Sequence, residues 1–163
     1  MNTGIYKTSL DSLAKGITIA ITVLFASLIF FHFTILKDVR NIAPFLTIIL
    51  LTIIYLIAYL FHPAAYELTA DTLVIKRPAS SVVIHRNTIK SVELLSNGSL
   101  SGSIRTFAVG GLFGYYGKFA NSSFGSMTWY ATRRNNAVLL RITDNRKIIL
   151  TPDEVEKFVA AFS

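Results

Sequence analysis

The sequence predicts a membrane α-hairpin followed by a mainly-β domain that ends in a helix. Three observations support this fold class. Two apolar runs, residues 16–36 and 42–61, lie almost back to back near the start of the 163-residue chain. After residue 62 the spacing of apolar residues changes from helical to alternating, which is typical of short antiparallel strands. Residues 152–162 return to helical spacing, so the chain is expected to end in an amphipathic helix.

Each apolar run has the length of a membrane span. A helix rises about 1.5 Å per residue, so a run of about 20 residues matches the roughly 30 Å hydrocarbon core of a bilayer. Residues 16–36 carry no ionisable side chain except His32, and residues 42–61 carry none. Without charged groups inside the spans we expect an anchor, not a transporter. The resulting hairpin, residues 16–61, places the rest of the chain on the same side as the N-terminus.

Residues 1–15 are expected to form a short juxtamembrane segment with an amphipathic turn. The cations flanking the spans are balanced between this segment and the loop of the hairpin. Lys76 and Arg77, a short distance beyond the second span, favour a cytoplasmic location of both termini. The sequence therefore predicts a cytoplasmic domain over residues 62–163.

The elements of this domain follow from its apolar pattern. The alternating runs predict strands at residues 66–68, 72–76, 81–85, 89–94, 103–109, 126–132, 137–142 and 146–150. Thr151 is the expected N-cap of the last helix, with Pro152 at its first position and Glu154 completing a capping box. A sheet of this size needs its open end covered, and the helix at 152–162 can cover it.

Several segments of the domain together carry a family resemblance. They are Tyr66–Leu68 with residues 72–77, residues 89–93, the glycine–aromatic stretch 110–125, and the ending 148–153 that leads to Phe158. In these segments the chain resembles the bacterial pleckstrin-homology (PH)-like domains, in their membrane-tethered branch. The resemblance implies a partly open antiparallel β-barrel of about seven strands, capped by a C-terminal helix. It also implies a non-catalytic module in the bacterial cytoplasmic (inner) membrane.

A catalytic or cofactor site is hard to assemble from these residues. The three histidines, His32, His62 and His85, are scattered, and no carboxylate pair is placed for acid–base work. The chain has no cysteine, which excludes a thiolate metal site. Gly117-Lys118 lacks the following Ser or Thr of a phosphate-binding loop. We therefore expect no enzyme, no cofactor and no metal, and an enzyme with an unrecognised site is the least favoured alternative.

The glycine–aromatic stretch is the candidate interaction surface. One interpretation is structural: glycines permit tight turns while aromatic rings fill the mouth of the barrel. The other is a surface at headgroup depth, on which Lys118 contacts phosphate. Glycines recur every third residue, which would also suit one turn of helix. The candidate residues are Gly111, Phe113, Gly114, Tyr115, Tyr116, Gly117, Lys118 and Phe119.

The net charge of +7 lies mostly on the domain, where twelve Lys or Arg face seven Asp or Glu. Attraction to anionic lipid is one interpretation and a solvated face is the other. The turn at residues 69–71 is acidic and small, which argues against a specific inositol-phosphate pocket. Nucleic acid is not favoured, because the basic pairs do not form one stripe. The candidate lipid-facing residues are Lys76, Arg77, Arg86, Lys90, Arg133 and Arg134.

The leading functional hypothesis is a membrane-anchored, non-catalytic module for protein interaction or oligomerisation at the inner leaflet. Its partner would be a second copy of the chain or another membrane protein. The alternative is binding of anionic lipid headgroups by the basic and aromatic surface.

Overall fold

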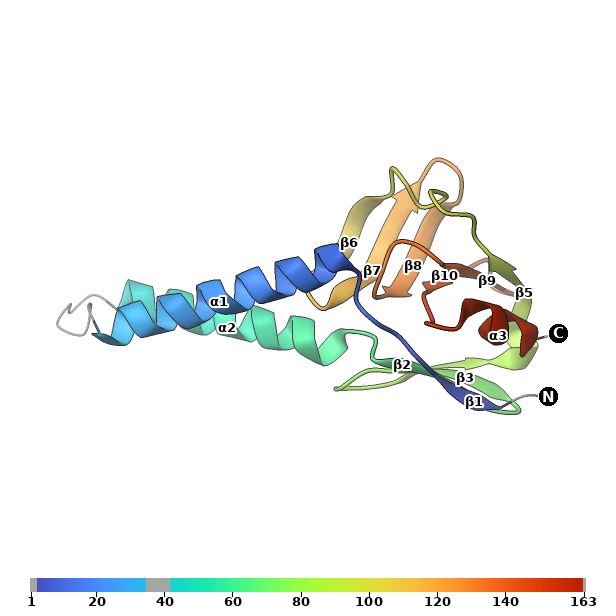
Figure 1. Ribbon diagram of the computed structural model, residues 1–163, viewed down its shortest axis with the longest axis horizontal. Helices are drawn as coiled ribbons and strands as arrows, with labels where there is room; N and C mark the ends of the chain where they lie inside the picture. The colour runs from blue at the N-terminus through green and yellow to red at the C-terminus, as the bar shows by residue number, and fades with distance from the viewer. Residues whose placement is uncertain (1–2, 35–41, 163) are drawn as a thin grey trace.

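The computed structural model describes residues 3–34 and 42–162. Two long apolar helices, α1 (Ser12–Thr34) and α2 (Ala43–Phe61), extend away from a mainly-β domain (Figure 1). By length and composition, both are able to cross a membrane. The expected end of the first run at residue 36 and the loop 37–41 lie outside the described residues.

Helix α1 begins earlier than the expected residue 16. Asp11 caps it: the Asp11 carboxylate accepts a 2.7 Å hydrogen bond from the backbone N–H of Ala14, in the first turn. This bond satisfies one of the N–H groups that a helix start leaves without a partner. The polar residues Ser12 and Lys15 therefore belong to the same helix as the apolar run.

The first of two sheets has four antiparallel strands in the order β1-β2-β3-β4. They are β1 (Gly4–Lys7), β2 (Ala65–Leu68), β3 (Thr72–Lys76) and β4 (Val82–His85). The expectation of an amphipathic turn in residues 1–15 is wrong, because Gly4–Lys7 pairs with β2. Tyr6 points inward onto Phe158, with ring centroids 5.0 Å apart, while Ile5 is exposed. The sequence of this strand lacks an apolar run, since Ile5 and Tyr6 are its only large apolar residues.

The second sheet has six strands in the order β5-β9-β10-β8-β7-β6. They are β5 (Ile89–Leu94), β6 (Ile104–Gly111), β7 (Gly114–Asn121), β8 (Gly125–Ala131), β9 (Val138–Ile142) and β10 (Lys147–Leu150). The β8–β10 pair is parallel, so the expectation of purely antiparallel pairing is wrong at this place. The two sheets do not close into a barrel, and β7 was not among the expected strands.

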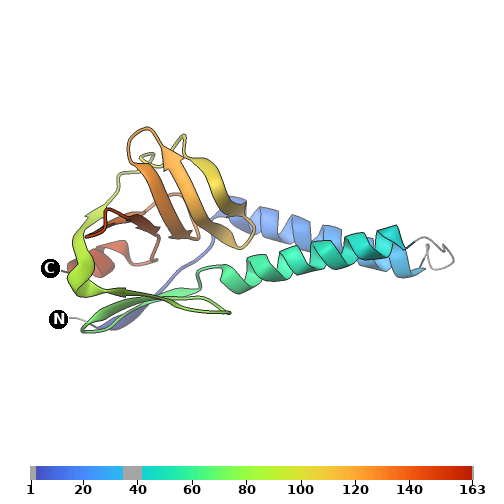
Figure 2. The same cartoon turned by 180° about the vertical axis from the view of Figure 1, so that it is seen from behind.

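The main core lies between the two sheets, and α3 (Val155–Ala160) packs into it (Figures 1 and 2). Phe158 of α3 is fully buried there. Alternate residues of β9 and β10 point to the other face of the six-stranded sheet, where Leu139 and Ile149 belong to a second core. The fold class predicted from the sequence, two apolar helices followed by a mainly-β domain with a C-terminal helix, is confirmed.

The last helix is shorter than the expected 152–162, and its expected cap is wrong. Glu154 occupies the N-cap position without a side-chain hydrogen bond. The Thr151 hydroxyl instead accepts a 2.9 Å hydrogen bond from the backbone N–H of Thr132, at the end of β8. Because Thr151 is fully buried, its hydroxyl needs a partner inside the domain and is not available to the helix.

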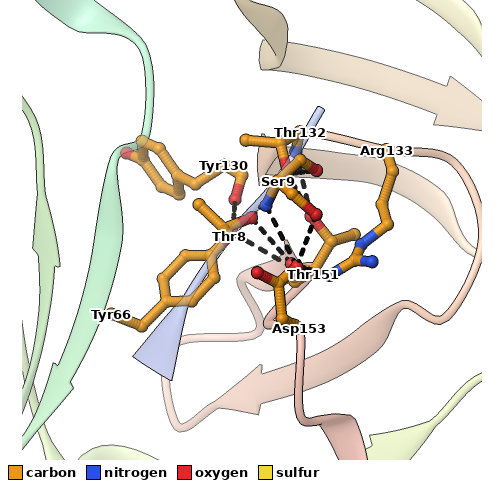
Figure 3. A network of polar contacts seen from close by, with 8 residues as sticks. All are labelled: Thr8, Ser9, Tyr66, Tyr130, Thr132, Arg133, Thr151 and Asp153. Carbon is orange, nitrogen blue, oxygen red and sulfur yellow. Dashed lines mark hydrogen bonds and ion pairs between the residues drawn. The ribbon is translucent and has the colours of Figure 1, made fainter. Parts of the chain in front are cut away.

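This bond belongs to a polar cluster that fastens the segment between β1 and α1 to the domain (Figure 3). Thr8 donates a 2.8 Å hydrogen bond to the backbone carbonyl of Thr151, and Thr132 donates one of 2.8 Å to the carbonyl of Ser9. The Asp153 carboxylate accepts a 2.7 Å hydrogen bond from the Ser9 hydroxyl and pairs with Arg133. The N-terminal segment is therefore an integral part of the β domain.

Candidate interaction surfaces

The glycine–aromatic stretch folds into the β6–β7 hairpin. Its turn runs from Gly111 to Gly114, which pair with each other in the register of the two strands. Gly111, Phe113 and Gly114 all have positive φ angles, of 110°, 56° and 120°. The interpretation of this segment as one turn of helix is therefore wrong. Glycines and aromatics on both faces of the hairpin hide the alternation that would identify its strands.

The turn of the hairpin packs against both long helices. The Thr18 hydroxyl of α1 accepts a 3.0 Å hydrogen bond from the backbone N–H of Phe113. The Phe113 ring lies against the rings of Tyr55, Tyr59 and His62, with centroids 5.2, 5.4 and 5.7 Å away. A Cβ on Gly111 would lie 2.5 Å from the Cδ1 atom of Ile17, so this side chain would have to shift, and the φ of +110° at Gly111 also favours glycine.

The β domain also caps the C-terminal end of α2. A helix leaves its last four carbonyls without partners in the helix itself. The Tyr116 hydroxyl donates a 2.5 Å hydrogen bond to the carbonyl of Ala58, and the backbone N–H of Ala79 donates one of 2.9 Å to that of Leu60. His62 contacts the carbonyl of Tyr59 through Nδ1 at 2.5 Å. Tyr116 and Ala79, which are far apart in sequence, thus fix the end of this helix.

Tyr115, Tyr116 and Phe119 are buried, so the interpretation of them as an exposed surface at headgroup depth is wrong. Tyr115 donates a 3.2 Å hydrogen bond to the Asp11 carboxylate that caps α1. Burial, together with the negative charge of Asp11, raises the pKa of Tyr115 to about 12. Burial also raises the pKa of Tyr116 above its usual range. Phe119 stacks on Trp129 with ring centroids 4.2 Å apart.

Two residues of the hairpin are exposed, unlike the buried aromatic residues of β7. Lys118 and Phe107 form a cross-strand pair on β7 and β6, and both side chains are exposed. Among the predicted surface residues, Lys118 is therefore the one whose side chain remains available on the outside. Phe107 was not among the candidate residues, because a Phe on an expected strand usually belongs to the core.

The candidate basic residues do not gather in one place. Lys76 and Arg86 lie at opposite ends of the β3–β4 hairpin, because Thr72 pairs with His85 while Lys76 pairs with Ala65 across the sheet. Separation along these strands keeps the two cations apart.

Most of these cations also have a partner within the protein: a carboxylate, a backbone carbonyl or an aromatic ring. Lys76 forms a 2.7 Å ion pair with Glu67, and Arg133 pairs with Asp153. Arg86 donates a 2.8 Å hydrogen bond to the carbonyl of Ala161. Arg77 donates to the Ser80 carbonyl at 2.7 Å and lies over the Phe61 ring, while Arg134 lies over the ring of Tyr115. Lys90 lines an open cavity of about 620 Å³ between β5 and α3.

Within residues 3–34 and 42–162, no group of three or more His, Asp or Glu side chains is arranged so that it could hold a metal ion. The β6–β7 hairpin therefore provides the two candidate surfaces of the domain: its exposed pair Phe107 and Lys118, and its contacts with α1 and α2.

The two sheets and their C-terminal helix define the class of domain, a mainly-β domain closed by a short helix. Residues 64–163 match the family model of the bacterial PH domain, and the chain belongs to this family. PH domains are generally non-catalytic and mediate contacts with proteins or lipids. Neither a curated protein nor a solved structure matches the chain. The matched residues exclude β1, which the structure nevertheless places in the first sheet.

Proposed function

We propose that this protein is a membrane-anchored, non-catalytic interaction module. Helices α1 and α2 cross the bacterial cytoplasmic membrane as a hairpin and hold the PH domain against its inner leaflet. There the domain binds a second copy of the chain or another membrane protein.

One observation carries the proposal: the two long helices contact the β domain at one end and remain exposed along the rest of their length. In the most apolar part of α1 no residue is buried inside the protein, and in that of α2 only 6% are. A helix in the core of a water-soluble protein would be mostly buried. Exposed Leu, Ile and Phe side chains over this length need an apolar environment outside the protein, which a bilayer supplies.

The attachment of both helices to one domain supports the topology. β1, just before α1, pairs with β2, just after α2. The two ends of the hairpin must therefore lie on the same side of the bilayer. A cytoplasmic location follows from the basic residues near the second span, Lys76 and Arg77.

Crosslinking of the full chain in native membranes, followed by mass spectrometry, tests the interaction function. We expect one recurrent set of crosslinks from the β domain to a second copy or to another membrane protein. A chain that remains monomeric and uncrosslinked at its native level would contradict this function.

A further inference from the structure

Strand β6 leaves one edge of the six-stranded sheet open. β7 occupies its other side, and no described strand pairs with the outer one. Residues 104–107 of this strand are exposed, including the apolar side chains of Ile104 and Phe107. Phe107 is 85% exposed, more than Phe30 of α1 at 68%. An exposed strand edge that carries large apolar side chains is a typical place for a contact with another surface.

A bulge sets which side chains share a face of this edge. The register shifts between Arg105 and Phe107, which brings Phe107 opposite Lys118 on β7. Directly paired residues of an antiparallel sheet point to the same face. Nearer the turn, that face carries Tyr116, which bonds to Ala58 of α2. The exposed pair Phe107 and Lys118 is therefore continuous with the junction between the sheet and the helices.

The open edge faces the direction in which the helices extend. In both views β6 is the strand of its sheet nearest the far end of the helical pair, and it runs more across the helix axes than along them (Figures 1 and 2). The turn at Gly111 packs on Ile17, at the start of the first apolar run. Phe107 is four residues from Gly111, or roughly 13 Å along the strand.

We propose that the open edge of β6 rests on the membrane surface, with Phe107 in the interfacial layer and Lys118 at the phosphates of anionic lipids. This inference rests on the membrane hairpin of the proposed function. An aromatic ring next to a long cationic side chain suits the boundary between headgroups and acyl chains. A cation near an anionic surface contributes about 1 kcal/mol.

A second copy is the less favourable occupant of this edge. Its β domain would have to fit between the first domain and the bilayer. Antiparallel pairing of two β6 strands would also place Arg105 of both copies on adjacent strands, and each copy has a net charge of +7. An anionic lipid surface needs no such space and attracts these cations instead of repelling them.

The absence of cysteine in the chain allows a direct test with single-cysteine variants. The full chain carrying Phe107→Cys is labelled with an environment-sensitive fluorophore and reconstituted into vesicles of phosphatidylcholine with phosphatidylglycerol. The matched control is Leu94→Cys on β5, which is 49% exposed at the opposite edge of the same sheet. Retention of each variant after alkaline carbonate extraction is measured on the same samples.

We expect a blue-shifted emission at position 107, strong quenching by spin-labelled lipid, and several-fold less quenching by aqueous iodide than at position 94. Adding Lys118→Glu is expected to reduce this protection in anionic vesicles and to leave it unchanged in pure phosphatidylcholine. Equal protection from iodide at position 107 with and without Lys118→Glu, measured in anionic vesicles, would contradict the role of Lys118.

Equal access of iodide to positions 107 and 94, in a chain that resists carbonate extraction, would overturn the inference and leave the membrane anchor standing. Release of the chain by carbonate would instead overturn the anchor and the inference with it. A disulfide between two copies at position 107 in vesicles would identify a second copy as the occupant and would also overturn the inference.

Discussion

The hydroxyl of Tyr116 on β7 donates a 2.5 Å hydrogen bond to the backbone carbonyl of Ala58 in the last turn of α2. These residues lie far apart in sequence, and their contact is buried. It joins the β domain directly to a helix that we propose to cross the membrane. Movement of the domain relative to the helix would leave this carbonyl without a partner, so the contact opposes such movement.

Removal of this bond should loosen the junction. Tyr116→Phe keeps the ring but leaves the buried Ala58 carbonyl without a partner, which typically costs about 1–3 kcal/mol. We expect a lower melting temperature of the full chain in detergent and faster amide exchange at residues 58–62. Tyr59→Phe is the matched control, since Tyr59 is 46% exposed and its ring contact with Phe113 is retained. Equal melting temperatures of the two variants would contradict the role of Tyr116.

Gly117 permits close pairing of β6 and β7. At its φ of +112°, a Cβ would lie 2.5 Å from the Phe107 carbonyl oxygen and 2.7 Å from the Ala108 Cα. Because both atoms belong to the backbone, the strands would have to separate. Gly117→Ala should therefore destabilise the domain by more than about 2 kcal/mol, or prevent its folding.

Gly98→Ala provides the control for this experiment. Gly98 also has a positive φ, of +93°, but a Cβ there would have no neighbour within 4 Å. Its cost should be limited to conformational strain, about 1 kcal/mol. Chemical denaturation of both variants in detergent compares them. Similar losses of stability would show that the β6–β7 contact is less restrictive than its geometry indicates.

The N-terminal segment should be necessary for the β domain. Deletion of residues 1–10 removes β1, the contact of Tyr6 with Phe158, and the hydrogen bonds of Thr8 and Ser9. It also exposes the edge of β2. We expect amide exchange in Ala65–Leu68 to become much faster, and the unfolding transition to broaden. Unchanged protection of β2 would contradict an integral role of this segment.

The stability of the domain should fall at high pH. The pKa of Tyr115 rises from 10.0 to about 12 on folding, so its contribution is fully present below pH 10 and is lost as the pH rises through about 12. Ionised Tyr115 would also face the Asp11 carboxylate. Tyr115→Phe should reduce stability at neutral pH by about 1 kcal/mol and make the loss above pH 10 less steep. Melting temperatures between pH 7 and 12 test this, and identical slopes would contradict it.

The sequence predicts the long helices from the length of their apolar runs, and most strands from short β-branched runs between turn residues. Residues 72–76, for example, are such a run, bounded by the turn at 69–71 and by Pro78. β7 has no such run and no apolar period, because Gly114 and Gly117 carry no side chain and Tyr115 and Tyr116 are buried on opposite faces. The parallel β8–β10 pair could not be predicted either, since pairing between distant strands depends on the packing of the whole domain.

The candidate surface was predicted only in part. The sequence indicates that the glycine–aromatic stretch is unusual, but not that the long helices cover its turn. Tyr116 and Lys118 look equally available in the sequence and lie on the same face of the hairpin, yet Tyr116 is buried at its contact with α2 while Lys118, further from the turn, is exposed. Phe107 gains its significance from a bulge and from the open edge of a sheet, and neither feature leaves a signal in the sequence alone.

Alkaline carbonate extraction of membranes that contain the full chain tests the central claim most directly. The account predicts that the chain stays in the membrane pellet, because two helices with lipid-facing apolar side chains hold it there even if the β domain loses stability at that pH. Release of the intact chain into the supernatant would contradict the membrane hairpin.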